Sequence, residues 1–282
     1  SYSYDSIVIE TVFLYLAILF GLLYKDKAIN KWTVVGYAVF VVMLSICKGG
    51  TYMPLCLLTM LIPPERFRDK KQKWIFVGSM AALAVASFLV STLSYALYVA
   101  SPTAEQAAGT YLGREAYGAA GLLADPMNFI LKLMRTLFLS GDGFIETMLG
   151  MQLGWLNVFV SRIVIYGMLA MILIANIPLR DNKNQLQFTV SRLEKVSCVI
   201  VFTLSALMVF ASMFMSWTPR NSLTIQGVQG RYFLPAFPVF LLVCRSKDIT
   251  ASKDRSRILM FLAVCLQCVA IYGILLSLED VL

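Results

Sequence analysis

The residues that could carry chemistry in this chain are carboxylates, cations and tyrosines, because the sequence contains no histidine. Without an imidazole, Ser-His-Asp and Cys-His catalysis is excluded, and general acid or base work falls to Asp, Glu, Lys or Tyr. Asp5 lies just before the first apolar stretch, and Glu10 lies about one helical turn inside it. Both are candidate catalytic carboxylates.

Each of these carboxylates also has a structural interpretation. Asp5 is well placed to cap the helix that the first apolar stretch predicts. A carboxylate inside a membrane costs roughly 2.5 to 3.5 kcal/mol unless it has a partner. We therefore expect Glu10 to face protein rather than lipid, in a buried hydrogen bond or a shallow contact with water.

A second group consists of the cations Lys48, Arg162, Arg220 and Arg231, which lie outside the main basic loops. A guanidinium group matches two phosphate oxygens at once. Lys48, Arg220 and Arg231 therefore suggest a site for phosphate or pyrophosphate, whereas Arg162 reads better as a helix-end anchor. All four could instead extend to lipid headgroups or pair with acids such as Asp142 and Glu146.

Metal and redox chemistry find little support. The six cysteines lie within or at the end of apolar stretches, where they behave as small hydrophobic residues. Cys265 and Cys268 form a C-x-x-C pair, but a structural zinc site needs a second pair of ligands. A Ca²⁺ or Mg²⁺ site would need clustered carboxylates, which no loop offers. We identify no metal site and no cofactor.

The elements that must position these residues are membrane spans. The chain is 59% hydrophobic and 14% charged, with a mean hydropathy of +0.75, so its solvent must be lipid. Most of the 24 Lys and Arg residues fall in four loops, at 25–31, 64–73, 180–195 and 245–257. Because short cytoplasmic loops of membrane proteins are basic, we predict Ser1 outside and these loops inside. The net charge of +8 then suits an anionic leaflet rather than nucleic acid.

The apolar pattern predicts an all-α, polytopic integral membrane protein with about eight segments in one membrane domain, 1–282. The segments are 7–24, 33–47, 51–62, 74–100, 156–177, 196–217, 232–244 and 258–278. Those at 33–47 and 51–62 are too short to cross a ~30 Å core as helices. Lys48-Gly49-Gly50 lies between them, so we expect a sunken turn whose backbone is satisfied by protein or a cavity.

The largest outer loop, 101–154, should contain an amphipathic helix in the membrane interface near 126–140. Asp125-Pro126 is a helix start signal, and Gly141 is a plausible stop. Asn128, Lys132 and Arg135 share one face of this helix, and the remainder is apolar. We therefore predict that Lys132 and Arg135 contact lipid phosphates. A second outer loop covers 219–231.

Three segments together resemble a known family. They are Ser3-Tyr4-Asp5, the run from Lys48-Gly49-Gly50 through Tyr52 and Pro54 to Ile62-Pro63, and Gln229-Gly230-Arg231-Tyr232-Phe233-Leu234-Pro235. This set resembles the bacterial membrane family called domain of unknown function 2142 (DUF2142). That family is similar to the GT-C glycosyltransferases, multi-span enzymes that use polyprenyl-phosphate sugars on the outer face of the membrane.

The resemblance implies a binding region for a lipid-linked sugar. Its residues would be Lys48, Tyr52, Arg220, Gln229, Arg231 and Tyr232. The chain also reads as a fragment that lacks the family's N-terminal part, where GT-C enzymes usually hold their acidic residue. Asn157 stands where we expect Asp, which weakens any role for a carboxylate there.

Three functions remain open. The first is a glycosyltransferase-like handler of polyprenyl-linked sugars in cell-envelope polysaccharide synthesis, in the bacterial cytoplasmic membrane. The second is a transporter or flippase for a polysaccharide precursor, which predicts ionisable residues along a path through the membrane. The third is a non-catalytic membrane subunit. Membrane lipids and a polyprenyl-linked sugar are the expected partners of the first, and nucleic acid is not.

Overall fold

The computed structural model describes residues 4–25, 29–99, 117–153, 158–179, 190–246 and 248–279. Helices dominate these ranges. The strands found there are the two-residue β1 (Gln152–Leu153) and β2 (Val158–Phe159), which pair antiparallel. The predicted all-α class is confirmed.

Apolar helices fill the predicted spans. Within the described ranges, five helical stretches are long and apolar enough to cross a membrane. Four belong to α1 (Tyr4–Tyr24), α3 (Lys70–Val99), α8 (Arg192–Ser216) and α10 (Ser256–Glu279), and the fifth, Lys31–Gly50, is α2 (Lys31–Ile46) together with the turn that follows it. The other predicted segments contain shorter elements: the 3₁₀ helix η2 (Met53–Leu61) in 51–62, α7 (Arg162–Ala175) in 156–177 and α9 (Phe237–Cys244) in 232–244. The remaining helical elements are η1 (Cys47–Gly50), η3 (Pro64–Arg66), α5 (Gly118–Ala124), α6 (Pro126–Met148), η4 (Gly230–Tyr232) and η5 (Leu234–Ala236).

Polar side chains set where several of these helices begin. The Asn30 side chain accepts a hydrogen bond from the Thr33 amide at 2.9 Å at the start of α2. Asp125 does the same for the Asn128 amide at 3.0 Å before α6. Each such acceptor satisfies an amide that has no partner within its helix.

The described residues form two compact units that interleave along the sequence. Unit 1 comprises Ser1–Phe138 and Ile200–Val228, and unit 2 comprises Leu139–Val199 and Gln229–Leu282. The division falls inside α6 and inside α8.

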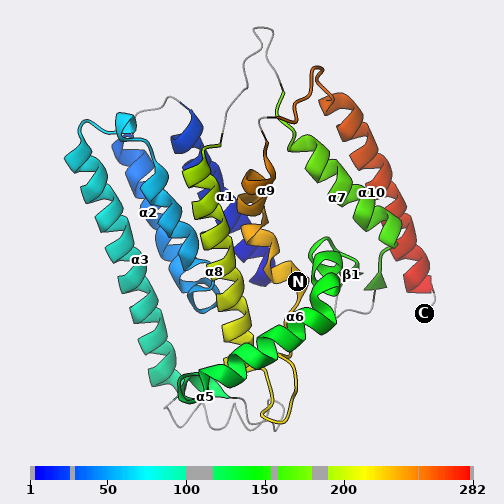
Figure 1. Ribbon diagram of the computed structural model, residues 1–282, viewed down its shortest axis with the longest axis horizontal. Coiled ribbons are helices and arrows are strands. Elements are labelled where there is room, and N and C mark those ends of the chain that lie inside the picture. The colour runs from blue at the N-terminus through cyan, green and yellow to red at the C-terminus, as the bar shows by residue number, and fades with distance from the viewer. Residues whose placement is uncertain are drawn as a thin grey trace. The chain divides into compact units, whose positions relative to one another are not determined.

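The core of unit 1 lies where α1, α2, α3 and η2 pack together (Figure 1). Val12, Tyr15 and Leu19 from α1 are completely buried, as are Tyr37 from α2 and Leu55 from η2. The chain between α2 and η2 turns through η1, where Lys48 has φ +46° and Gly49 has φ +62°. This left-handed turn interrupts the helix and separates the two short segments, as their lengths predict.

Helix α6 begins at Pro126 as predicted and lies across the direction of α8 rather than along it (Figure 1). Its surface exposes large apolar side chains, among them Leu131, Met134 and Phe138. The predicted stop at Gly141 is wrong, because α6 continues to Met148. A glycine inside a helix costs only about 1 kcal/mol relative to alanine, and contacts of the following turn, described below, offset that cost.

In unit 2, α7 and α10 run side by side (Figure 1). Val160, Val164, Ile165 and Ala270 form a buried cluster between them. At one end of the unit, the Asn176 side chain donates to the Leu241 carbonyl at 2.6 Å, and Lys195 donates to the Arg245 carbonyl. These bonds tie the ends of α7 and α9 to the start of α8.

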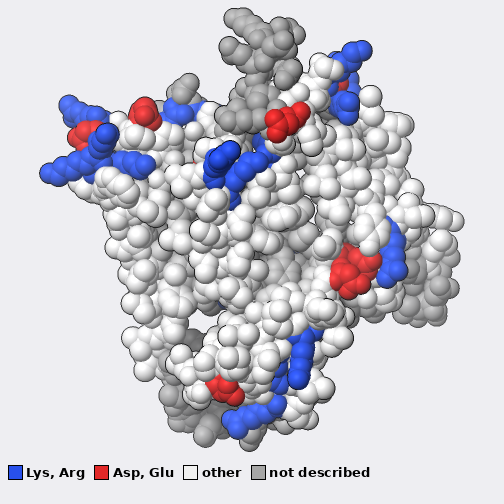
Figure 2. Space-filling view, viewed as in Figure 1, with Lys and Arg blue, Asp and Glu red and all other residues white. Residues whose placement is uncertain are grey.

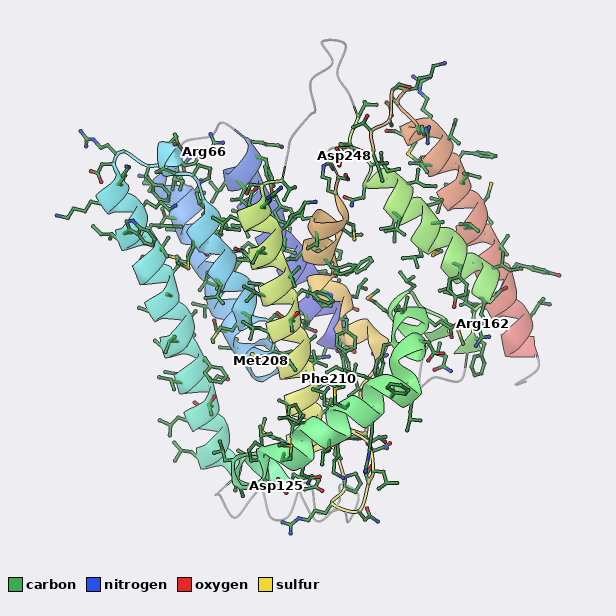
Figure 3. All side chains as sticks on the ribbon, viewed as in Figure 1. Arg66, Asp125, Arg162, Met208, Phe210 and Asp248 are labelled. Atoms are coloured by element: carbon green, nitrogen blue, oxygen red, sulfur yellow. The ribbon has the colours of Figure 1, made fainter. Side chains whose placement is uncertain are left out.

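Basic loops that the sequence places on the same side lie together within each unit. In unit 1, Arg66 donates to the Leu22 carbonyl at 3.1 Å and accepts from the Ile29 amide at 3.3 Å. In unit 2, the Lys195 contact with Arg245 joins the other two loops. Figure 2 shows Lys and Arg side chains gathered near such loops, with uncharged surface along the helices. We call these the basic-loop ends. In unit 1, Arg66 lies at this end and Asp125 at the opposite one (Figure 3).

Candidate functional site

The left-handed turn of unit 1 carries an ion pair between two predicted site residues. The Lys48 ammonium lies 2.5 Å from Oδ1 of Asp5, and both side chains are 18% exposed. Asp5 lies in the first turn of α1 rather than before it, so it does not act as the predicted cap. The structure thus joins a candidate base to a candidate phosphate ligand.

Protein groups satisfy the backbone of this turn, as predicted. The Lys48 amide donates to the Tyr4 hydroxyl at 2.7 Å, and the Lys48 carbonyl accepts from the Thr51 hydroxyl at 2.7 Å. Gly50 has φ +76°, and a Cβ there would lie 2.5 Å from the Phe88 ring. Hydrogen bonds with Tyr4 and Thr51 and the close approach of Phe88 therefore hold the turn in its left-handed conformation.

A buried hydroxyl network that sequence reasoning missed lies along η2. The Tyr15 hydroxyl donates to the Leu55 carbonyl at 3.2 Å and lies 2.7 Å from the Tyr37 hydroxyl, which is 2.7 Å from Oγ1 of Thr59. Because Tyr15 uses its proton on Leu55, Tyr37 must donate to Tyr15 and Thr59 to Tyr37. The sequence does contain a signal for this network. Tyr15, Tyr37 and Thr59 lie inside apolar runs, and a hydroxyl group surrounded by lipid must find its hydrogen-bond partner within the protein.

The Gln229-Gly230-Arg231-Tyr232 turn of unit 2, which we call the QGRY turn, packs directly on α6. The Gly230 amide donates to the Thr147 hydroxyl at 3.1 Å. A Cβ at Gly230 would lie 2.0 Å from the Phe144 carbonyl oxygen and 2.4 Å from the Met148 amide nitrogen. Only glycine fits this contact, which fixes the backbone from which the neighbouring side chains extend.

Two polar atoms of the QGRY turn, Oε1 of Gln229 and Nε of Arg231, are buried, although both residues are only half-buried. Oε1 of Gln229 has almost no exposed surface and no hydrogen-bond partner among the described residues. The Arg231 guanidinium lies 5.8 Å from the centre of the Tyr232 ring, in cation–π geometry. An acceptor that is buried without a donor costs about 1 to 3 kcal/mol, so a ligand hydroxyl or amide that reached Gln229 would be stabilised.

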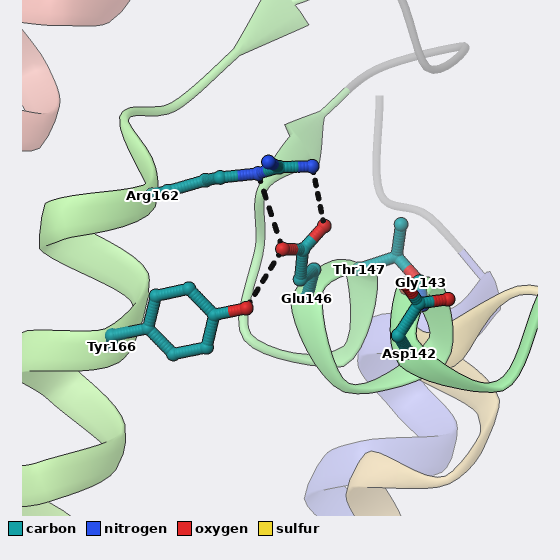
Figure 4. A network of polar contacts seen from close by, with 6 residues as sticks. All are labelled: Asp142, Gly143, Glu146, Thr147, Arg162 and Tyr166. Atoms are coloured by element: carbon teal, nitrogen blue, oxygen red, sulfur yellow. Dashed lines mark hydrogen bonds and ion pairs between the residues drawn. The ribbon is translucent and has the colours of Figure 1, made fainter.

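Glu146 forms a second polar centre in unit 2 (Figure 4). Its carboxylate, in a residue only 8% exposed, lies 3.2 Å from Nε of Arg162 and accepts from the Tyr166 hydroxyl at 2.9 Å. Pairing of Arg162 with Glu146 is confirmed. Asp142 instead accepts from the Gly143 amide at 2.9 Å. The network also joins the last turn of α6 to α7, which accounts for the extension past Gly141.

Two further predicted site residues, Glu10 and Tyr52, differ in their exposure. The expectation that Glu10 faces protein is wrong, because its side chain is exposed. The buried face of α1 passes through Val8, Val12 and Tyr15, and at 3.6 residues per turn Glu10 is about 200° around the helix from Val8. Tyr52 is 1% exposed and packs inside unit 1.

The two predicted lipid contacts separate. Lys132 is buried, donates to the Ser222 carbonyl and lies 5.5 Å from the centre of the Tyr117 ring. Arg135 is exposed. Arg220 is also exposed, and its carbonyl accepts from the Tyr117 hydroxyl at 2.8 Å. Lys132 therefore holds the 217–228 loop against α6, and the predicted contact with lipid phosphates stays a prediction for Arg135.

Asp5, Glu10, Lys48, Tyr52 and Arg220 belong to unit 1, whereas Gln229, Arg231 and Tyr232 belong to unit 2. Asn157 lies outside the described residues. Within the ranges that the structure describes, no three Cys, Asp or Glu side chains form a group that could hold a metal ion.

Both turns lie inside the region that a family model matches, residues 1–240, and the model is described as a predicted membrane protein. The chain belongs to the DUF2142 family. No curated protein and no solved structure matches it. Membership in DUF2142 agrees with the spans and with the resemblance seen in the K-G-G and Q-G-R-Y motifs.

Proposed function

We propose that this DUF2142 protein binds a polyprenyl-phosphate-linked sugar and transfers the sugar during cell-envelope polysaccharide synthesis. The observation that carries the proposal is the QGRY turn. It combines a guanidinium at Arg231 with a buried acceptor at Gln229, on a backbone that Gly230 fixes against α6. A phosphate bound to a hydroxyl-rich sugar offers the two complementary groups.

The reaction would proceed by attack of an acceptor hydroxyl on the anomeric carbon of the sugar. The bond from that carbon to the phosphate oxygen breaks, the phosphate leaves with the electron pair, and a carboxylate takes the hydroxyl proton. Arg231 would stabilise the departing phosphate. In unit 1, Asp5 and Glu10 are the proposed carboxylates, and Lys48, Tyr52 and Arg220 are proposed binding residues. In unit 2, Tyr232 joins Gln229 and Arg231 in the proposed binding set.

The proposal also requires an orientation. We place the basic-loop ends in the cytoplasm and Ser1 outside, in the bacterial cytoplasmic membrane, because basic loops are retained inside. A cysteine at Ser252, in a basic loop, should resist a membrane-impermeant thiol reagent in intact cells, whereas a cysteine at Asn221 should react. The opposite pattern would reverse the orientation.

The test of function is binding of polyprenyl phosphate, with and without a sugar, to the protein in lipid nanodiscs. Loss of a charge-assisted hydrogen bond is worth about 1.5 to 3 kcal/mol, so Arg231→Ala should weaken binding at least tenfold. Arg231→Lys keeps the positive charge but loses the paired N–H donors of the guanidinium group, so it should give an intermediate loss of affinity. The control is Arg257→Ala, an exposed arginine in a basic loop.

Each result decides something. Equal binding by Arg231→Ala and the native protein would reject the QGRY turn as the phosphate site. Absence of binding to every polyprenyl carrier would move a transporter for another solute, or a non-catalytic subunit, ahead of glycosyl transfer. Binding without sugar release to any acceptor would favour a flippase for the same lipid-linked precursor.

A further inference from the structure

Unit 2 contains a cavity at its basic-loop end, and none of the residues that line it belongs to the QGRY turn. It has a volume of about 220 Å³ and lies between the end of α7, the 245–255 loop and the start of α10. Three cations line it, Arg245, Lys253 and Arg255, together with one acid, Asp254. The lining thus has a net positive charge.

The walls of this cavity are tied together. Leu179 pairs with Ala251 as an isolated β-bridge, and the Ala251 amide donates to the Pro178 carbonyl at 2.9 Å. The Arg245 guanidinium donates to the Asn176 carbonyl at 3.4 Å. The loop that carries Lys253 and Arg255 is therefore fixed to the end of α7, and the cavity is part of the fold.

Asp254 offsets only part of the positive charge of the cavity, because it contributes one negative charge against three positive charges, and its carboxylate is bonded to the start of α10. Its Oδ1 accepts from the Ser256 amide at 2.8 Å and from the Ser256 hydroxyl at 2.5 Å. These bonds lower the pKa of the Asp254 carboxyl, so the group is ionised and directed at the start of α10. The lining keeps a net charge of +2, from three cations and one acid, and Lys253 and Arg255 are its exposed cations.

The rest of the lining is apolar and belongs to the ends of two helices. Ile174 and Ile177 come from α7 and the residues after it, and Leu259 comes from the first turn of α10. Both helices are apolar. An anion held by the cations would therefore be adjacent to hydrocarbon surface, an arrangement that suits an amphiphile better than a soluble ion.

We propose that this cavity is a binding site for the phosphate headgroup of an anionic phospholipid, with the cations on the phosphate and the lipid's apolar part against Ile174, Ile177 and Leu259. Basic pockets between membrane helices on the cytoplasmic side bind such headgroups. The site is independent of the proposed sugar transfer, because it uses other residues and another end of unit 2.

The chain provides a matched pair of arginines for the test. Arg255 lines the cavity, whereas Arg257, two positions later and also exposed, does not. The native protein and the variants Arg255→Gln and Arg257→Gln are placed in nanodiscs of phosphatidylcholine containing phosphatidylglycerol. Native mass spectrometry then measures how much phosphatidylglycerol each protein retains. Thermal stability in pure phosphatidylcholine verifies that both variants fold.

A basic residue near an anionic surface contributes roughly 1 kcal/mol, so Arg255→Gln should weaken phosphatidylglycerol retention about fivefold. Arg257→Gln should change it less than twofold. Equal losses in the two variants would show a general effect of loop charge and overturn the site. Displacement of the lipid by inorganic phosphate at millimolar concentration would assign the cavity to a soluble phosphate compound and overturn the lipid assignment.

Discussion

The K-G-G turn of unit 1 separates two short apolar segments and the QGRY turn of unit 2 leads into a third, yet their polar groups are used differently. In the K-G-G turn, Lys48 pairs with Asp5, and its backbone bonds to Tyr4 and Thr51. In the QGRY turn, the backbone is locked by α6, but Oε1 of Gln229 is buried with no hydrogen-bond partner among the described residues.

This difference separates two uses of a broken helix in a membrane. A turn whose polar groups find partners within the protein stabilises the fold, since an unsatisfied group in lipid costs several kcal/mol. A turn that keeps a buried acceptor without a donor carries that cost in the absence of a ligand. We therefore expect the K-G-G turn to serve mainly the fold, and we propose the QGRY turn as the binding element.

The largest expected effect is at Gly230. Gly230→Ala would place a Cβ 2.0 Å from the Phe144 carbonyl oxygen, and relief would require moving the turn from α6. We expect a loss of about 3 kcal/mol or more in the free energy of unfolding. Gly49→Ala, which meets no atom within 4 Å but has φ +62°, should cost only about 1 kcal/mol. Unfolding in detergent measures both, and similar costs would contradict the packing at Gly230.

Next in size is the hydroxyl network beside the K-G-G turn. Tyr37→Phe removes the donor to Tyr15 and the acceptor for Thr59, so we expect a loss of about 1.5 kcal/mol. Tyr272→Phe on α10, where the ring is 64% exposed, is the control and should be neutral. A neutral Tyr37→Phe would show that the three hydroxyls do not stabilise η2.

A smaller effect is expected from the ion pair. Asp5→Asn keeps the shape but removes the charge opposite Lys48, and because both side chains are partly exposed the loss should be about 1 kcal/mol. High salt should reduce the difference between the variant and the native protein, since salt screens the pair. A difference that does not change with salt would mean that hydrogen bonding, not charge, stabilises the contact.

Gln229→Leu should have the smallest effect on stability and the sharpest effect on function. Removal of an acceptor that has no partner among the described residues should leave the free energy of unfolding unchanged within about 0.5 kcal/mol, or raise it. Binding of the polyprenyl-linked sugar should fall, while Gln226→Leu, an exposed control, should leave it intact. A strongly destabilised Gln229→Leu would show that Gln229 serves the fold and would remove the contrast between the turns.

Much of the fold was predictable from the sequence because lipid imposes strong local rules. Apolar runs gave the spans, Asp125-Pro126 gave the start of α6, and the lengths of 33–47 and 51–62 predicted an interrupted helix. The end of α6 was not predictable from Gly141. That end depends on Glu146, which meets Arg162 and Tyr166 from a different helix.

The candidate site, too, was predictable only in part from the sequence. Residue type singled out Lys48, Arg220 and Arg231 as cations away from the basic loops. Spacing along the chain did not reveal that Lys48 meets Asp5, that Lys132 is buried under Ser222, or that Glu10 is exposed. Such contacts depend on which faces of separate helices meet, and the rotation of a helix about its axis is set by its neighbours.

The sequence by itself determined that this is a helical membrane protein of the DUF2142 kind, because hydropathy and motif order are properties of the chain read in one dimension. The tertiary structure decided which polar groups have partners. Contacts between segments distant in sequence bury Oε1 of Gln229 in the QGRY turn. Such contacts also satisfy the backbone of the K-G-G turn and join the segments that line the cationic cavity. A hydrogen bond needs its two atoms within about 3.5 Å, and only the folded chain brings them there.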